Sequence, residues 1–340
     1  MPTTLQSADA QLNTGAQLSA LLHGAGVAPL GDIAWIRVTG EDRVRWLNGM
    51  VTNAIQTLAP GEGCYNFVLN AQGRIQGDLT AFALDDSILL ETSRDQVEKL
   101  LAHLEHFIIM DDVELAVVED RSGILVAGPH AVSLFAQLGL TPEPASSLQV
   151  QSARYNAAPV DIIHAHSPLV PRFELWSNSE TVAALTSDLI AGGANPVASE
   201  ALEHLRILEG TPRYGIDIRD RDLPQETEQT RALNFAKGCY LGQEIVERIR
   251  SRGAVHRMFG GFELSGTLPI PGTALEADSK PVGELTSAAA ISTSESSAAI
   301  KQIALGYVRR EALASAQARG LPITYPGGIA TPAALPFSVP

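Results

Sequence analysis

The spacing of apolar residues divides the chain into two parts with different patterns. Up to about residue 250, segments with helical spacing of apolar residues alternate with short apolar strands and hairpins. After about residue 255, short strands are separated by turns rich in Gly, Pro and Ser, which is typical of a small β-barrel or sandwich. The pattern therefore predicts an α+β fold with a C-terminal β-barrel, and not a doubly wound sheet.

The individual elements follow from the same spacing. Helices are predicted at residues 42–55, 95–106, 130–138, 181–190 and 199–209, the last with Ser199 as its N-cap. Strands of the first part are predicted at residues 34–38, 65–69, 74–84, 87–92, 113–118, 123–126, 159–163 and 172–176. The barrel is predicted to contain strands at residues 258–264, 282–288, 303–308 and 322–325 and a short helix at 310–318. Residues 292–297 are expected to form a mobile polar loop.

Composition indicates the class of protein and the cellular compartment that we expect for this chain. The chain has 340 residues, enough for two or three domains, and its 45% apolar and 18% charged residues are ordinary for a globular protein. Its two cysteines, Cys64 and Cys239, provide neither a disulfide framework nor a four-thiolate metal site. Neither a secretory leader nor a run of 18 apolar residues is visible. We therefore expect a reduced, cytoplasmic protein that does not insert into membranes.

Charge is distributed unevenly along the chain. The formal net charge is −14, which argues against bulk nucleic-acid binding because phosphate contacts need a basic surface. Residues 237–257 nevertheless carry five Lys/Arg against two Glu, a local charge of +3. Within this segment Arg248, Arg250 and Arg252 could bind a small polyanion, although a solvated charged face is the commoner fate of such a run.

Cys239 lies at the start of this basic segment, in the octapeptide KGCYLGQE at residues 237–244. A thiol beside several cations is more acidic and more reactive than a buried structural thiol. The alternative is that Cys239 is a small core residue and that the glycines form turns. Charge and thiol chemistry alone leave both interpretations open.

Several further motifs occur upstream of the octapeptide in a fixed order. They are LRILEG at residues 205–210, PRYGIDI at 212–218, LPQE at 223–226, the hairpin GRIQGDL at 73–79, and a block from 38 to 61 that contains Thr52-Asn53 and Pro60-Gly61. Together with KGCYLGQE they resemble the glycine-cleavage T-protein (aminomethyltransferase) superfamily. The octapeptide is specifically similar to the YgfZ branch of folate-binding proteins, which act in iron–sulfur cluster assembly or repair. The resemblance runs from about residue 32 to the end and is thinner in the middle and in the barrel.

The resemblance implies three interwoven parts around a central channel that holds tetrahydrofolate. Residues 1–250 would form a folate-binding region of two interwoven α+β subdomains, and residues 251–340 would form the barrel domain. Folate is the implied ligand, and iron–sulfur client or carrier proteins are the implied partners.

The resemblance also implies roles for individual residues. Glu209 would accept hydrogen bonds from the pterin, with a salt bridge to Arg206 as the alternative. Asp78 would lie near the reactive N5/N10 region and manage a proton, with the end of a polar hairpin face as the alternative. Gly77 stands where the transferases have a second acid, which puts transferase chemistry in doubt.

A second group of residues is predicted at or near the channel. We expect Tyr65, Lys237 and Arg248 to contribute to cofactor binding, and Asn66 is a weaker candidate. Core packing is expected for Trp46 and Cys64. Cys239 would be a functional thiol, favoured as thiolate by Lys237 and by a following helix, and would act as nucleophile, redox-sensitive group or single cluster ligand.

These observations predict a tetrahydrofolate-binding accessory protein of iron–sulfur cluster assembly or repair. An aminomethyltransferase that moves a one-carbon unit to tetrahydrofolate is the first alternative. A module that binds RNA or protein through Arg248, Arg250 and Arg252 is the second. Whether the protein turns over a substrate is left open by the sequence.

Overall fold

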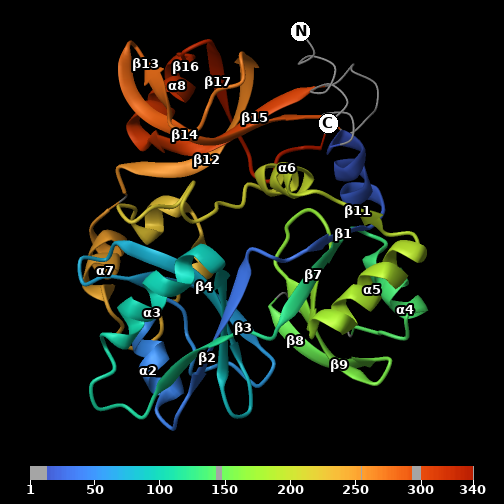
Figure 1. Ribbon diagram of the computed structural model, residues 1–340. Helices are drawn as coiled ribbons and strands as arrows, with labels where there is room; N and C mark the ends of the chain where they lie inside the picture. The colour runs from blue at the N-terminus through green and yellow to red at the C-terminus, as the bar shows by residue number, and fades with distance from the viewer. Residues whose placement is uncertain (1–13, 143–147, 254, 293–299, 340) are drawn as a thin grey trace.

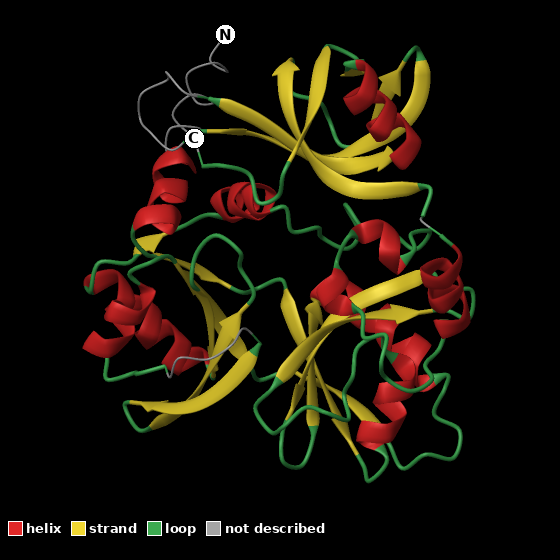
Figure 2. Ribbon diagram, turned by 180° about the vertical axis from the view of Figure 1, so that it is seen from behind, coloured by secondary structure: helices red, strands yellow, loops and turns green. Residues whose placement is uncertain are grey.

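Two β-sheets lie side by side beneath a closed β-barrel, and their strands are antiparallel except for one parallel pair at the edge of the second sheet (Figures 1 and 2). The structure is a computed structural model that describes residues 14–142, 148–253, 255–292 and 300–339. The barrel is one continuous stretch of the chain, whereas the second sheet takes strands from both before and after the first sheet. The inner surfaces of all three meet at the centre of the molecule.

The first sheet has five strands in the order β3-β4-β5-β2-β6. Their bounds are β2 (Ile33–Thr39), β3 (Gly63–Leu69), β4 (Ile75–Ala83), β5 (Ile88–Ser93) and β6 (Glu114–Val118). One face of this sheet packs against α2 (Arg43–Met50) and α3 (Val97–Glu105), through a cluster that includes Leu47 and Leu100. The 3-10 helix η1 (Arg94–Gln96) leads into α3. The other face of the sheet is directed toward the centre of the molecule.

The second sheet has six strands in the order β11-β1-β7-β10-β9-β8. Their bounds are β1 (Gly26–Pro29), β7 (Ser122–Ala127), β8 (Gln149–Tyr155), β9 (Ala158–Ala165), β10 (Arg172–Ser177) and β11 (Asn195–Pro196). Helices α4 (Ala131–Gln137) and α5 (Ser179–Ala191) cover its outer face. Because β1 precedes β2 in the chain but pairs with β7, the two sheets are interwoven.

The strand register fixes which side chains face the centre. Tyr65 lies opposite Thr80, Thr80 opposite Glu91, and Glu91 opposite Trp35, so these four residues share one face of the first sheet. In the second sheet Glu174 projects from the face shared by Arg172 and Trp176 because alternate residues of a strand point to the same side. The two faces pack on each other in the largest apolar cluster, which also takes in helix α6 (Ser199–Glu209) and the barrel.

The barrel closes in the order β12-β15-β14-β13-β16-β17. Its strands are β12 (Arg257–Gly266), β13 (Thr273–Ala277), β14 (Lys280–Ile291), β15 (Lys301–Arg309), β16 (Ile323–Tyr325) and β17 (Gly328–Ala333). Helix α8 (Arg310–Arg319) packs on its interior cluster, and α6 lies beneath it against the two sheets (Figure 1). Between α6 and the barrel the chain forms η2 (Pro224–Thr227), η3 (Thr230–Ala232) and α7 (Gln243–Arg252).

The α+β class and the C-terminal barrel are confirmed, but several details of the sequence prediction are wrong. The helix predicted at 42–55 ends at Met50, because the Asn48 side chain accepts a hydrogen bond from the backbone N–H of Ile55 and Val51 forms a β-bridge with Val68. Ser199 is the first residue of α6 and not its cap, since Ala198 holds that position. The barrel has six strands where four were predicted.

Two predictions are not decided by these elements. Most of the polar loop at 292–297 lies outside the described residues. The boundary between a folate-binding region and a barrel domain at residue 250 stays a prediction.

Candidate functional site

The centre of the candidate site is a hydrogen-bonded carboxyl on the inner face of the first sheet. The Tyr65 hydroxyl donates to Oδ2 of Asp78 at 2.6 Å, and Gln96 Nε2 donates to Oδ1 at 2.8 Å. The backbone N–H of Asp78 donates in turn to Gln96 Oε1 at 3.0 Å. Burial raises the pKa of Asp78, while the two donated bonds act in the opposite direction. Asp78 is thus held in one orientation with its proton affinity increased.

Gly77 explains how Gln96 can approach this carboxyl. A Cβ on residue 77 would lie 2.7 Å from Leu100 Cδ2 and 2.9 Å from Gln96 Oε1. An acidic side chain at this position would therefore force Gln96, the residue that orients Asp78, to move.

Arg231, which sequence reasoning missed, covers Tyr65. Its guanidinium carbon lies 4.1 Å from the centre of the Tyr65 ring, close enough for a cation–π contact. Burial lowers the pKa of Arg231, and the nearby Tyr65 and Asp78 partly restore it. Asn53 Nδ2 donates to the carbonyl of Arg231 at 2.9 Å, and Thr52 Oγ1 donates to that of Ala232 at 2.7 Å. The Thr52-Asn53 motif thus holds the backbone at Arg231 and Ala232 in position.

A second buried carboxyl belongs to Glu209, at the end of α6. Its side chain is 6% exposed and accepts a hydrogen bond from the Ser167 hydroxyl. Burial raises the pKa of Glu209, and Arg172 opposes that shift. The ion pair with Arg206, the alternative role for Glu209, is not formed, because Arg206 instead binds Glu203 and Asp217.

His166 lies within electrostatic reach of two arginines of this region. Burial, together with the charges of Arg231 and Arg172, lowers the pKa of His166 to about 4. Arg231 acts on Asp78, and Arg172 acts on Glu209. The sequence offered no sign of this group, because its members lie in separate segments of the chain.

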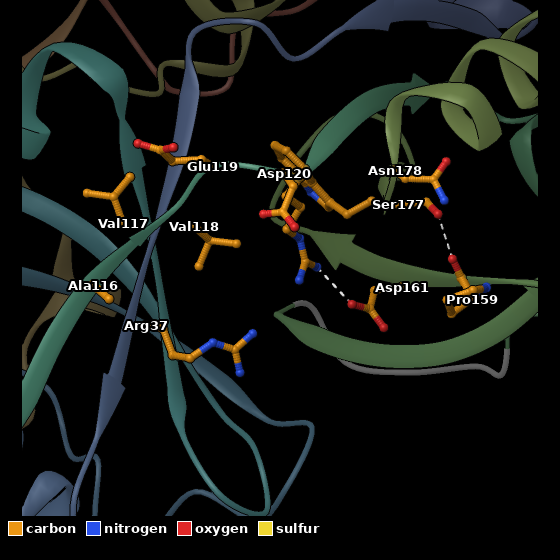
Figure 3. Close-up of a pocket in the computed structure, with 12 residues that line it drawn as sticks. Arg37, Ala116, Val117, Val118, Glu119, Asp120, Pro159, Asp161, Ser177 and Asn178 are labelled. Atoms are coloured by element: carbon orange, nitrogen blue, oxygen red, sulfur yellow. Dashed lines mark hydrogen bonds and ion pairs between the residues drawn. The ribbon is translucent and has the colours of Figure 1, made fainter.

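Another pair of carboxyls, also missed from the sequence, lies where the two sheets meet. Burial and the charge of Glu174 raise the pKa of Glu91 well above its usual range. Glu174 is 3% exposed, accepts a hydrogen bond from Trp176 Nε1 at 3.1 Å and lies 3.6 Å from Arg172. Arg121 approaches from the other side, stacked 4.6 Å from the centre of the Trp35 ring and paired with Asp161 at 2.8 Å. Figure 3 shows Arg37 and Asp161 facing the cavity at this seam, which has a volume of about 660 Å³.

Lys237 has a different role from the one expected. Its Nζ donates to the carbonyl oxygens of Asn48, Val51 and Asn53, each at 2.6 Å. All three donors are thereby used, which argues against direct cofactor binding. Burial lowers the pKa of Lys237 to about 8, and the thiol that influences it is Cys64 and not Cys239. Lys237 therefore fastens the 237–241 loop to the end of α2.

Cys239 is exposed on this loop. Helix α7 begins at Gln243, after Gly242 in the left-handed conformation (φ 81°). Among the described residues, no hydrogen bond or ion pair engages the Cys239 thiol. Cys64 agrees with the expected packing role, since burial raises its pKa to about 11.

The remaining candidates lie at the edge of the site or in the core. Arg248 is exposed on α7, about 200° around the helix from the buried Val246. Asn66 is buried and accepts a hydrogen bond from the backbone N–H of Asn53 at 2.8 Å. Trp46 is 4% exposed and packs in the core as expected. The structure thus brings Tyr65 and Asp78 into direct contact and leaves Arg248 on the surface.

Comparison with known proteins identifies the family to which the chain belongs. The family described as the GCVT N-terminal domain matches residues 1–237. This is well over half of the chain, which therefore belongs to that family. The expected membership of the T-protein superfamily is confirmed.

Within the superfamily, the similarity to YgfZ-type proteins is confirmed as well. The chain is 29% identical to the tRNA-modifying protein YgfZ of Yersinia pseudotuberculosis, over 73% of this chain and 74% of that protein. It is 25% identical to the aminomethyltransferase of Frankia alni, over 80% of this chain and 76% of that protein. A relative from Arabidopsis thaliana, named as a chloroplastic transferase, is 26% identical over 81% of this chain; the match spans 64% of that protein, less than two thirds of its length.

A solved structure shares the whole architecture. The glycine cleavage system aminomethyltransferase T from Bartonella henselae superposes with a TM-score of 0.82, covering 96% of this chain and 89% of that protein at 20% identity. This likeness establishes the fold. In the part of the chain that the structure describes, no helix is both long enough and apolar enough to span a bilayer.

Proposed function

We propose that this protein binds a reduced folate and serves, through Cys239, as an accessory factor of iron–sulfur cluster assembly or repair. The observation that carries the proposal is the buried Asp78 carboxyl, which Tyr65 and Gln96 hold in one orientation. The buried Glu209 carboxyl and the arginines Arg231 and Arg172, whose charges act on the two carboxyls, support it. Two buried carboxyls with raised pKa values suit a ligand that offers amide and amino donors on a flat ring.

The residues present fit a folate. Glu209 would accept hydrogen bonds from the pterin, and Asp78 would face the N5/N10 region, where it can hold or release a proton. Tyr65 and Gln96 keep the Asp78 carboxyl in one orientation. When bound, the folate would supply a one-carbon carrier, and the protein groups would bind, orient and protonate it.

The Cys239 part of the proposal rests on its exposure and on the anchored loop that presents it. A single exposed thiol cannot hold a cluster alone. It can provide one ligand or one redox-active sulfur to a client or carrier protein. Relatives are named tRNA-modifying proteins, so an iron–sulfur enzyme of tRNA modification is a reasonable client, and we place this activity in a reduced compartment such as the cytoplasm.

Anaerobic titration calorimetry with tetrahydrofolate tests the folate assignment. We expect Asp78→Ala and Glu209→Ala to weaken binding by about tenfold or more, the equivalent of one lost charge-assisted contact. Cys239→Ala should bind like the wild type. No heat of binding with the wild-type protein would refute the folate assignment.

Complementation tests the role of the thiol. In cells that lack the protein, wild type and Cys64→Ala should restore the activity of iron–sulfur enzymes, whereas Cys239→Ala should not. Equal rescue by both cysteine variants would rule out a functional Cys239.

An aminomethyltransferase is the second candidate, favoured by the proton-holding Asp78. The fit of Gly77 against Gln96 and Leu100 opposes it, because a second acid there would force both of these side chains to move. Reconstitution with an aminomethylated lipoyl carrier and tetrahydrofolate distinguishes the two. Turnover to ammonia and methylene-tetrahydrofolate that survives Cys239→Ala would favour the transferase.

A further inference from the structure

Strand β6 is an edge strand of the first sheet, and its outer side is open. The opposite edge strand, β3, is covered by other segments. Val68 of β3 forms a β-bridge with Val51. The N–H of Gly63, at the start of β3, donates to the carbonyl of Leu148 at 2.7 Å. Along β6, by contrast, the described residues supply no backbone hydrogen bond outside the ladder with β2. We refer to the open side of Glu114–Val118 as the β6 edge.

The alternation of hydrogen bonds across the sheet identifies the backbone groups that face outward. The N–H of Arg94 donates to the carbonyl of Asp32, just before β2, at 2.7 Å. Asp32 and every second residue after it therefore face β5, and the residues between them face β6. Arg37 is one of the latter and lies opposite Ala116, so Ala116 bonds to β2. The neighbours of Ala116 direct N–H and C=O away from the sheet, and they are Leu115 and Val117.

The shape and sequence of β6 suit the addition of another strand. Proteins commonly block an open edge with proline, lysine or a bulge, whereas β6 reads ELAVV and pairs with β2 in continuous register. Val117 is 40% exposed. Ala116 and Val118 line the cavity of about 660 Å³ that separates them from Asp161 of the second sheet (Figure 3). An added strand would therefore place alternate side chains in this cavity.

The charges along the β6 edge define the chemistry of a suitable strand. Glu114 stands at one end, and Glu119 and Asp120 stand at the other. All three are exposed, and none of them forms an ion pair within the described ranges. The cation of this region, Arg37, lies at the middle of the strand. The pattern favours positive charge at both ends of an added strand and apolar residues at its centre, and it repels the phosphates of RNA.

The same charges oppose pairing between two copies of this chain. Antiparallel pairing of two β6 strands centred on Ala116 would place Asp112 of one copy opposite Asp120 of the other. It would also place Glu114 beside Glu119 of the other copy. Like charges at such close range destabilise a strand pair. The acids therefore protect the edge from self-association and select a basic strand.

We propose that the β6 edge is a docking site for an extended segment of a partner protein, which adds to the first sheet as a further strand. The segment has β-branched or other apolar residues at its centre and Lys or Arg at both ends. Main-chain hydrogen bonds to Leu115 and Val117 supply binding, and the terminal charges supply selectivity. The site is separate from the carboxyls of Asp78 and Glu209, so this inference does not rest on the proposed folate function.

The test uses two synthetic peptides, KKVTVTVKK and its charge-reversed counterpart EEVTVTVEE, titrated into the full chain by calorimetry. We expect the basic peptide to bind at least about tenfold more tightly at low salt, with the difference narrowing in 0.5 M KCl because the acids are exposed. Amide hydrogen exchange followed by NMR gives the location. The outward N–H groups of Leu115 and Val117 should become protected in the complex, whereas that of Ala116 is protected already by β2.

Variants at Val117 test the strand geometry. Val117→Pro removes one outward N–H and leaves the ladder with β2 in place, because proline is tolerated where the N–H of an edge strand faces solvent. It should weaken the basic peptide by about tenfold, the equivalent of one lost hydrogen bond with the added steric block. Val117→Thr keeps the N–H and a β-branched side chain, and it should bind like the wild type. Urea unfolding of both variants confirms that they are folded.

A second variant tests the charges without changing the strand. Glu119→Lys combined with Asp120→Lys alters two exposed side chains, so the fold should be retained. We expect this variant to lose the preference for KKVTVTVKK over EEVTVTVEE. A preference that survives the double substitution would overturn the charge assignment.

The remaining outcomes decide the proposal in the same way. If neither peptide protects the amides of Leu115 and Val117, or if Val117→Pro binds like Val117→Thr, strand addition at the β6 edge is wrong. If the wild-type chain dimerises in sedimentation experiments and Val117→Pro does not, a second copy occupies the edge and the assignment of a basic partner is overturned.

Discussion

Lys237 belongs to the specific octapeptide motif, yet its side chain binds backbone carbonyl oxygens of another segment. Its ammonium joins three carbonyl oxygens at and just beyond the end of α2. Carbonyls at a helix C-terminus lack intrahelical partners, and a cation there is favoured by the helix dipole as well. The residue therefore determines where the Cys239 loop lies and does not act on a ligand.

Replacing Lys237 by Met keeps the aliphatic stem and removes all three bonds. We expect the free energy of unfolding to fall by about 3 kcal/mol, since hydrogen bonds to charged groups are each worth about 1.5–3 kcal/mol and are not additive. The backbone N–H of Leu241, which donates to Gly49, should exchange faster with solvent as the loop loosens. Lys280→Met, at an exposed position of β14, is the control. Equal urea midpoints for the two variants would disprove the anchoring role.

At the scale of elements, the junction between the β3–β4 hairpin and α7 depends on Gly242. It has φ 81° at the start of α7, and an added Cβ would lie 2.6 Å from the carbonyl oxygen of Asn70. The close approach of the two segments lets Val246 pack against the same cluster as Tyr65. The motif glycine thus serves packing beside the site.

Gly242→Ala should therefore destabilise the protein by at least about 1–2 kcal/mol, the cost of a left-handed non-glycine residue, with the clash added to it. Gly238→Ala lies in the same motif, has no atom within 4 Å of its added Cβ, and should be nearly neutral. Urea unfolding of both variants measures the difference. A neutral Gly242→Ala would mean that the hairpin and α7 can separate without cost.

The same scale shows which elements the sequence could and could not predict. The β3–β4 hairpin and α3 were predicted because their apolar residues alternate or recur at helical spacing. Strand β8 was missed because most of its residues are polar and partly exposed, and β13 was missed because it is short and partly exposed. Strand β17 contains a proline, which weakens any strand signal.

At the scale of the molecule, the candidate site combines distant parts of the chain. Asp78 and Tyr65 were predicted because they belong to local motifs. No local sequence motif marks Arg231, His166 or Arg172. Only the folded structure, in which the two sheets and η3 meet, brings them to the candidate site. Sequence motifs could therefore indicate the carboxyls of the site but not the histidine and the two arginines near them.

The meeting of the two sheets also predicts a pH-dependent stability that arises from Glu91. Its pKa is raised in the folded protein, so the folded state keeps a proton that the unfolded state releases above about pH 4.3. Stability must then fall as the pH rises through the interval between these two pKa values. Because Gln cannot ionise, Glu91→Gln avoids this loss and should become more stable than the wild type as the pH rises above the unfolded-state pKa.

Urea unfolding between pH 5 and pH 8 measures this effect, with Glu98→Gln on the exposed side of α3 as the control. The advantage of Glu91→Gln should grow with pH over this range, whereas the control should follow the wild type at every pH. If the difference were constant with pH, Glu91 would be ionised in the folded protein and its negative charge would be balanced by Arg121 and Arg172, which are the cations that already oppose its pKa shift. The two sheets would then be joined by an ion-pair network, and Arg172, which also acts on Glu209, would be shared between that network and the proposed folate site.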